Sequence, residues 1–269
     1  MKTTVYLIRH SVRINTKDVI ESWKTSQDKV LRSEKIILSV TGEKRAEILS
    51  NEEELQNIDV VYTSNCVRTL QTAKYLLEKQ HLKANIDERF DEKRVGKPND
   101  KEYPDWYTRQ YEDENFKTEG GESQAEVRER VNEAFQEVVS QNKGKRIAIF
   151  SHGYAITFLL LKWCKLNNVN NKHKLEISFN GKTIFNKKLN SPEVFKLVLD
   201  ENNDDFDVMI YGHIHQGFIQ EKEGFVFANP GSISLPKCNS AHSYIVLVDN
   251  KIVLKDVDGE VLKEYEMKK

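Results

Sequence analysis

The stretch TTVYLIRH at residues 3–10 is a β-rich apolar run that ends in an arginine and a histidine. Two more runs have the same design: VVYTS at residues 60–64 and RIAIFSHG at residues 146–153. Continuous apolar runs of this kind are typical of strands that are buried on both faces of a parallel sheet. In such sheets the functional side chains gather at the carboxyl ends of the strands. We therefore expect the polar residues that close the three runs to lie together.

Helical patterns separate these strands. Apolar residues recur at helical spacing in residues 67–77 and 123–139, and residues 155–163 are strongly apolar. The run TGEKRAEIL at residues 41–49 predicts another helix, with Thr41 as its N-cap. This alternation of strands and helices predicts an α/β fold with a mainly parallel sheet and helices on both faces.

The pattern changes after Asn202. Short β runs separated by turn signals follow at residues 207–211, 225–228, 243–248 and 251–256. Residues 202–205 are a candidate linker, so the sequence predicts an α/β domain over 1–203 and a small all-β appendage over 204–269. The apolar runs of this tail need a packing partner. We expect the tail to dock on the first domain, to self-associate through its strand edges, or to fold loosely.

Composition narrows the class of protein. The chain has 269 residues, 38% of them hydrophobic, and a net charge of -1, so nothing in the balance favours nucleic acid or a membrane as partner. The aromatic content excludes disorder, and no apolar run approaches the ~20 residues of a membrane span. Three widely spaced cysteines form neither a disulfide framework nor a zinc-binding pattern. We expect a cytoplasmic protein.

The residues at the strand ends predict a cationic pocket. Arg9, His10 and His152 close two of the runs, and Arg68 begins the helix after the third. Each has an ordinary structural interpretation when taken alone, as a strand-end pair, a turn histidine or a solvated arginine. Together they suit a phosphoryl group, because a neutral imidazole can attack phosphorus while arginines stabilise the charge on its oxygens. A leaving group then needs a proton donor, for which Glu92 is the candidate, although it stands in an acidic stretch.

The chain resembles the histidine phosphatase superfamily, also called the phosphoglycerate mutase-like family. The motifs that carry the resemblance are LIRH at 7–10, LSVTGE at 38–43, YTSNCVRTLQTA at 62–73, FDE at 90–92 with Gly96, GES at 121–123 and SHG at 151–153. The resemblance implies that His10 is the nucleophile, that Arg9, Arg68 and His152 hold the phosphoryl group, and that Glu92 donates the proton. It implies no metal and no other cofactor, and it assigns residues 121–123 to the start of a helix that frames the pocket.

Two departures from the family pattern concern the substrate. The family usually has glycine and glutamate after the histidine, where this chain has Ser11 and Val12. Ser11 can still offer its N–H and its hydroxyl to a phosphate. Residues 13–37 form a longer segment without a substrate-binding signature, which favours a phosphatase over a mutase. Residues 97–118, which are rich in aromatic side chains, are expected to cap the pocket or to cover the sheet.

The tail carries a second resemblance. GHIH at 212–215 and NPGS at 229–232 are similar to the carboxyl-terminal part of calcineurin-like metallophosphoesterases, in the small bacterial phosphodiesterase branch. That family uses two metal ions held by Asp, His and Asn side chains from earlier strands, and the matching motifs are absent from residues 1–203. We therefore interpret His213 and His215 as remnants without a catalytic metal site.

The sequence predicts a phosphatase that hydrolyses a small-molecule phosphate monoester through a phosphohistidine intermediate. The alternatives are a cofactor-primed phosphomutase that uses the same His10 chemistry and a non-catalytic protein that binds a phosphoryl ligand. A metal-dependent phosphodiesterase has the least support, because most of its ligands are missing. The sequence does not identify the natural substrate.

Overall fold

The computed structural model of the chain divides into two compact units. The larger unit comprises residues 7–193, and the smaller unit comprises residues 1–6 and 194–269. The structure describes residues 2–19, 21, 29–97, 103–170, 172–179, 182–200, 206–211, 217–222, 225–231, 240–248 and 251–266. Among these residues, no helix is both long enough and apolar enough to cross a membrane.

Four neighbouring strands of one larger sheet carry the candidate site. They follow in the order β1 (Lys2–Arg9), β4 (Arg146–Ser151), β2 (Val60–Thr63) and β3 (Ala84–Ile86). β2 pairs in parallel with both of its neighbours. The side chains of residues 147–150 in β4 are fully buried. These observations confirm the predicted α/β fold with a mainly parallel sheet.

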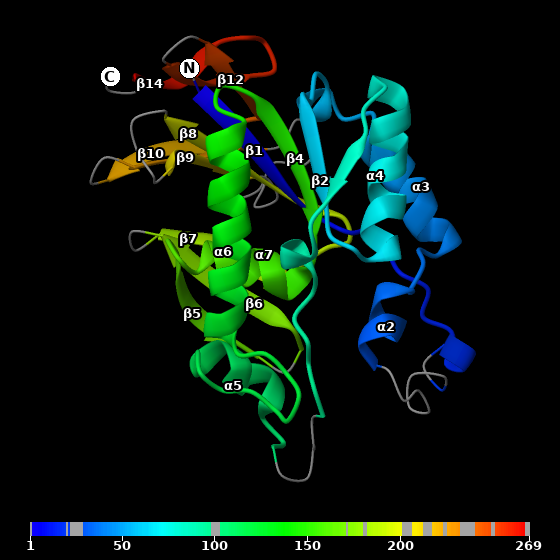
Figure 1. The fold of residues 1–269 in the computed structure, drawn as a ribbon. Coiled ribbons are helices and arrows are strands. Elements are labelled where there is room, and N and C mark those ends of the chain that lie inside the picture. The colour runs from blue at the N-terminus through cyan, green and yellow to red at the C-terminus, as the bar shows by residue number, and fades with distance from the viewer. Residues whose placement is uncertain are drawn as a thin grey trace. The chain divides into compact units, whose positions relative to one another are not determined.

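Helices alternate with these strands. They are α2 (Lys29–Glu34), α3 (Val40–Leu49), α4 (Val67–Gln80), α5 (Trp106–Glu112), α6 (Gln124–Gln141) and α7 (Gly153–Leu160), with short 3-10 turns η1 (Glu53–Leu55) and η2 (Glu88–Phe90). α3 lies beside α4, and α6 lies beside α7 (Figure 1). The buried face of α6 consists of the residues at helical spacing in the sequence, among them Val127, Val131 and Phe135. The helical periodicity is therefore confirmed by burial.

The first turn of α3 differs from the prediction. Its N-cap is Ser39, whose backbone is extended and whose hydroxyl accepts the Gly42 N–H at 3.0 Å, so the prediction of Thr41 as N-cap is wrong. Gly42 is needed here because a Cβ atom would lie 2.0 Å from the Val12 carbonyl oxygen. This close approach holds the segment after β1 against α3.

Of the two helices that frame the site, α6 begins as the sequence predicts, whereas α7 begins at Gly153, ahead of the predicted start at residue 155. Ser123 and Glu126 form a complete capping box at the start of α6. His152 is the N-cap of α7, which ends at Leu160 and not at Trp163. Residues 161–163 form turns.

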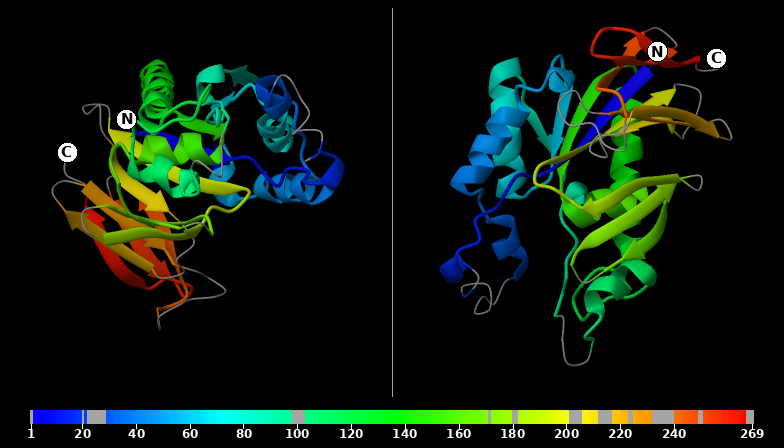
Figure 2. Two further views of the ribbon diagram at one scale, coloured as in Figure 1. Left: turned by 90° about the horizontal axis from the view of Figure 1, so that it is seen from below. Right: turned by 180° about the vertical axis from the view of Figure 1, so that it is seen from behind.

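An antiparallel sheet follows α7 in the larger unit. It consists of β5 (Lys165–Val169), β6 (Lys174–Phe179) and β7 (Lys182–Lys188), and β5 contacts α5. Figure 2 shows this sheet and α5 from two more sides. The sequence did not predict these strands, because their lysines and asparagines interrupt the apolar alternation.

The smaller unit contains strands of two sheets. In the first, β8 (Glu193–Asp200) is antiparallel to β9 (Phe206–Tyr211), β9 is parallel to β11 (Phe225–Pro230), and β11 is antiparallel to β10 (Gly217–Lys222). The second is the antiparallel sheet β12 (Ser243–Val248), β13 (Lys251–Asp256) and β14 (Val261–Glu266). The expected β runs of the tail are thus strands.

Both sheets of the smaller unit share one apolar core. It contains Val198, Ile210, Ile219, Val226, Ala228, Ile252 and Leu254, with Ile245 and Tyr265 packed against it. The apolar runs of the tail therefore pack against each other and against β8. The two units divide after Glu193, ahead of the predicted boundary after residue 203. The predicted linker at 202–205 lies outside the described residues.

Candidate active site

Three strand ends bring the candidate residues together. His10 follows β1, Ser64 follows β2 and His152 follows β4. The His10 N–H donates to the Ser151 carbonyl at 2.9 Å, and the Ser64 N–H donates to the Phe150 carbonyl at 3.0 Å. The ring centroids of His10 and His152 are 5.2 Å apart. The polar residues that close the three runs thus lie at one edge of the sheet.

His10 is buried and has a defined tautomer. Its Nδ1 lies 2.7 Å from the Ser11 carbonyl oxygen. Because a carbonyl oxygen can only accept a hydrogen bond, Nδ1 carries the proton and Nε2 has the lone pair. Burial lowers the pKa of His10 well below its ordinary 6.5, and the charges of Arg68 and Arg9 lower it further. At neutral pH the imidazole is therefore uncharged and can act as a nucleophile through Nε2.

His152 has partners at both ring nitrogens. Arg68 Nη2 lies 3.0 Å from Nδ1. Because a guanidinium can only donate, Nδ1 accepts this hydrogen bond, and the proton of the neutral ring is therefore on Nε2. Nε2 donates to Ser64 Oγ at 2.7 Å, and Ser64 contacts Thr69 Oγ1 at 2.8 Å. Thr69 in turn donates to the Cys66 carbonyl at 2.6 Å. This hydrogen-bonded chain fixes the ring, so in this arrangement His152 orients Arg68 and has no free nitrogen for a phosphoryl oxygen.

Arg9 keeps one buried donor without a partner. Its Nη1 donates to the carbonyls of Leu189 at 2.7 Å and Asn190 at 2.9 Å. Its Nε is buried and has no hydrogen-bond partner. The guanidinium lies over Gly153, where an added Cβ would be 3.4 Å from Nε. Arg9 is thus held on one side and offers an N–H on the other.

Arg68 repeats this arrangement. Its side chain is 2% exposed, and Nη1 donates to the Ser33 carbonyl at 2.5 Å while Nη2 donates to His152. Its Nε is also buried without a partner. A buried donor that lacks a partner costs about 1–3 kcal/mol, so binding of an acceptor that reaches either Nε group is favoured.

Ser11 does not offer donors to an anion in this structure. Its N–H donates to Thr72 Oγ1 at 2.9 Å, and its hydroxyl donates to the Gly42 carbonyl at 2.8 Å. Both groups that the sequence analysis considered for phosphate binding are therefore used inside the protein. Ser11 instead links the end of β1 to α3 and α4.

Two adjacent carboxyl groups border the pocket. Glu92 Oε1 accepts the N–H groups of Lys93 at 3.0 Å and Tyr154 at 3.1 Å, which ties Glu92 to the first turn of α7. Asp91 accepts the Asn65 N–H at 2.7 Å. Burial raises the pKa of Asp91 from 3.8 to about 6. Asp91 is therefore a competing proton donor, as its place in the acidic stretch suggested.

Arg13 is a residue of the site that the sequence analysis missed. It pairs with Leu38 in an isolated bridge, and the neighbouring Ile14 N–H donates to the Ile37 carbonyl at 3.0 Å. Desolvation lowers the pKa of Arg13 and the charge of Arg68 lowers it further, so this largely exposed side chain is a third cation within electrostatic reach of Arg68. Its closeness to His10 in the sequence was the available signal.

Three neighbouring tyrosines lie next to Glu92, whose carboxylate accepts the Tyr154 N–H. The ring centroids of Tyr111 and Tyr154 are 5.7 Å apart, and those of Tyr107 and Tyr111 are 5.6 Å apart. Gln110 in α5 donates to the Tyr154 hydroxyl at 2.9 Å. The described part of the aromatic segment therefore joins α5 to the start of α7, while residues 98–102 lie outside the described residues.

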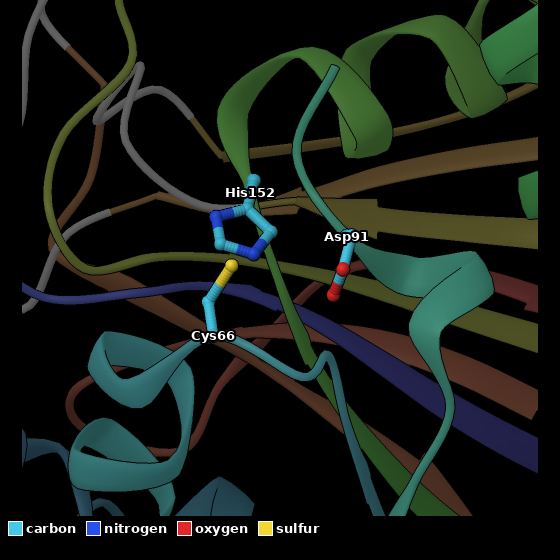
Figure 3. A group of neighbouring side chains, drawn as sticks. All are labelled: Cys66, Asp91 and His152. Carbon is cyan, nitrogen blue, oxygen red and sulfur yellow. The ribbon is translucent and has the colours of Figure 1, made fainter. Parts of the chain in front are cut away.

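One group of side chains among the described residues could hold a metal ion. Cys66, Asp91 and His152 each place a ligand atom within 4.8 Å of the others (Figure 3). The pair His213 and His215, which the second resemblance singled out, lies outside the described residues.

Family models match both parts of the chain. The model of the histidine phosphatase superfamily (branch 1) matches residues 5–185, and the model of the calcineurin-like phosphoesterase superfamily domain matches residues 165–251. A protein from Methanothermobacter thermautotrophicus described as a probable metallophosphoesterase is 41% identical over 56 residues, which are 21% of this chain. The match covers 27% of that protein, so the chain spans about a quarter of the length of this curated relative.

Solved structures have the same fold. A mycobacterial glucosyl-3-phosphoglycerate phosphatase is 18% identical with a TM-score of 0.54, and the match covers 74% of this chain and 91% of that one. YhfR of Bacillus stearothermophilus is 21% identical with a TM-score of 0.54, covering 76% and 94%. The phosphoserine phosphatase of Entamoeba histolytica is 17% identical with a TM-score of 0.50, covering 77% and 96%. Because the first family model covers well over half of the chain and includes every candidate site residue, the chain belongs to the histidine phosphatase superfamily.

Proposed function

We propose that this protein hydrolyses phosphate monoesters through a phosphohistidine intermediate on His10. The observation that carries the proposal is the combination of a neutral, oriented imidazole with two guanidinium groups that each keep a buried Nε–H without a partner. The Nε2 lone pair of His10 is the nucleophile. The Nε groups of Arg9 and Arg68 are donors for the oxygens of a phosphoryl group.

In the first step, Nε2 of His10 attacks the phosphorus atom of the ester. The nitrogen–phosphorus bond forms while the bond from phosphorus to the leaving oxygen breaks. Protonated Glu92 gives its proton to that oxygen, so the product leaves as an alcohol. Nδ1 keeps its proton and goes on donating it to the Ser11 carbonyl, which stabilises the positive charge that the ring gains.

In the second step, water attacks the phosphohistidine. Glu92, now a carboxylate, accepts a proton from this water, and the nitrogen–phosphorus bond breaks with its electron pair returning to Nε2. Inorganic phosphate leaves, and both His10 and Glu92 regain their starting states. Arg9 and Arg68 stabilise the phosphoryl charge in both steps.

The tyrosines and Arg13 bear on substrate choice. Tyr154 donates its backbone N–H to Glu92, so the rings of Tyr107, Tyr111 and Tyr154 lie on the side where a leaving group would depart. We infer a small-molecule ester whose leaving group contacts aromatic rings. Arg13 supports a preference for substrates with more than one anionic group.

Trapping the intermediate tests the proposal. The wild-type protein is mixed with p-nitrophenyl phosphate, quenched with base and analysed by mass spectrometry for a phosphoryl group on His10. His10→Ala should lose both the adduct and turnover by roughly 10⁴-fold or more, while its circular dichroism stays unchanged. The matched control is His81→Asn, which alters an exposed histidine at the end of α4.

The same material separates the alternatives. A phosphate-ester panel with and without EDTA detects metal-dependent diesterase activity, and phosphoryl exchange between two positions of a sugar or glycerate would indicate a mutase. Wild-type turnover in His10→Ala would contradict the proposal. Tight phosphate binding without turnover would favour the non-catalytic ligand-binding protein.

We also propose a reducing, cytoplasmic location. The support is that Cys66 and Cys164 are buried and unpaired. Free thiols of this kind are typical of reducing compartments.

A further inference from the structure

Three chain segments place a thiol, a carboxyl group and an imidazole next to each other. Cys66 is the N-cap of α4, Asp91 follows η2, and His152 is the N-cap of α7. Their ligand atoms lie within 4.8 Å of one another. Figure 3 shows the sulfur of Cys66 beneath the imidazole and the carboxyl group of Asp91 at one side of it. Because the three ligands come from separate segments of the chain, they can approach an ion from different sides.

The backbone around the three side chains is already fixed. The Asn65 N–H donates to Asp91 Oδ1 at 2.7 Å, and the Cys66 N–H donates to Ser64 Oγ at 3.2 Å. The carbonyl of Cys66 accepts from Thr69 at 2.6 Å. The ligands of a tetrahedral Zn²⁺ lie about 3.5 Å apart, so side-chain movements of about 1 Å close the site without moving the backbone.

The donor set selects the ion. Sulfur, imidazole nitrogen and carboxylate oxygen are the ligands that Zn²⁺ prefers, and the thiolate and the carboxylate balance its two charges. Cys66 releases its proton to solvent as the zinc–sulfur bond forms. Three protein ligands leave the fourth position to water or to an anion.

Binding of the ion excludes the present arrangement of His152. If Nε2 binds the metal, the proton of the neutral ring moves to Nδ1, which can then no longer accept from Arg68. If Nδ1 binds the metal, it displaces Arg68 directly. The Arg68–His152 hydrogen bond of 3.0 Å is lost in both cases. We propose that Cys66, Asp91 and His152 form a Zn²⁺ site and that zinc binding there inhibits the phosphatase; the inhibition rests on the proposed function, whereas the binding does not.

Cobalt spectroscopy tests the site without reference to activity. The full-length protein is stripped with EDTA, dialysed and titrated with Co²⁺, which takes the same geometry as Zn²⁺. The wild-type protein should show a thiolate-to-cobalt charge-transfer band at one equivalent, and added Zn²⁺ should remove it. Cys66→Ser should lose the band. Cys164→Ser, which removes the other described buried cysteine, should keep it.

The activity arm then tests inhibition. Zn²⁺ should inhibit wild type and Cys164→Ser alike. The inhibition constant of Cys66→Ser, measured against the metal-free turnover of the same variant, should rise at least about tenfold, because changing even an outer-shell partner of a ligand costs about 10–100-fold in metal affinity. If Cys66→Ser does not fold, Asp91→Asn provides the same cobalt test and should weaken binding.

Each outcome decides one part of the proposal. A wild-type protein without the charge-transfer band, or a band that persists in Cys66→Ser, overturns the zinc site. Binding without inhibition overturns the proposed effect of zinc on Arg68, but it still supports the zinc site. If the protein has no phosphatase activity, the cobalt titration still decides whether the site exists.

Discussion

Ser64 Oγ lies 2.7 Å from Nε2 of His152, so a residue at the end of β2 accepts the ring proton of the histidine that follows β4. Ser64→Ala leaves the Nε2 proton buried without an acceptor. We expect the free energy of unfolding to fall by about 1–3 kcal/mol and kcat to fall as well, because the ring no longer orients Arg68. Urea denaturation and steady-state kinetics measure the two effects. Ser140→Ala, on the exposed face of α6, should change neither.

Activity should persist below pH 6.5. The nucleophile needs an unprotonated Nε2, and the folded-state pKa of His10 lies well below 6.5. The rate of phosphorylation should therefore stay constant as the pH falls through 6.5 and should decrease only at more acidic values. The unfolded chain binds protons on His10 and His152 from about pH 6.5 downward, so these two histidines make the free energy of unfolding decrease there. Rapid-quench kinetics and thermal melts across pH check both statements; an acid limb centred on 6.5 would contradict them.

The leaving group should reveal the proton donor. Glu92→Gln should lower kcat on an alkyl phosphate by roughly 10²-fold or more, but less on p-nitrophenyl phosphate, whose leaving group needs little protonation. Asp91→Asn is the matched comparison, and it should affect both esters by a similar factor. If Asp91→Asn shows the leaving-group dependence and Glu92→Gln does not, Asp91 is the donor, in line with its pKa of about 6.

A truncation after Asn203 should be less soluble than one after Glu193. The longer fragment keeps β8 but removes β9, its antiparallel partner, and so exposes Leu197 and Leu199, which are buried in the full chain. The shorter fragment ends where the larger unit ends, but it keeps residues 1–6, which belong to the smaller unit. Light scattering and expression yield compare the fragments. A soluble, active fragment ending at residue 203 would support the boundary predicted from the sequence.

Self-association through the tail stays a proposal that can be measured. Val248 in β12 and Val261 in β14 are about half exposed, at 49% and 54%. Charged residues at sheet edges oppose edge-to-edge pairing, so Val248→Lys with Val261→Lys should shift the full-length protein toward monomer. Sedimentation at several concentrations measures the shift. A wild-type protein that is monomeric throughout would remove the proposal.

The sequence predicted those site residues that directly follow the ends of apolar strands. Apolar runs ending in Arg9-His10 and Ser151-His152 are visible in the sequence because burial demands continuous hydrophobicity and the polar residue then breaks it. Arg68 was also visible, since it begins the helix after β2. The burial of His10, Arg68 and His152 and the hydrogen bond between Arg68 and His152 follow from that geometry.

Other contacts depend on packing that no local pattern records. Ser39 and not Thr41 caps α3 because the Val12 carbonyl lies against Gly42, a contact between segments far apart in the chain. Arg13 belongs to the pocket because residues 12–14 are held against residues 37–39 by backbone hydrogen bonds. The two Nε groups without partners are likewise a property of the folded state alone.

Those two guanidinium N–H groups make the melting temperature of the protein depend on its buffer. An oxyanion that binds them in the folded state, such as phosphate or sulfate, stabilises that state by mass action, by about 2.7 kcal/mol when its concentration is 100 times its dissociation constant. The same anion occupies the place of the substrate. Preparations in phosphate buffer should thus be more heat-resistant and less active than preparations in chloride, and storage conditions and assay conditions for this enzyme should not be the same.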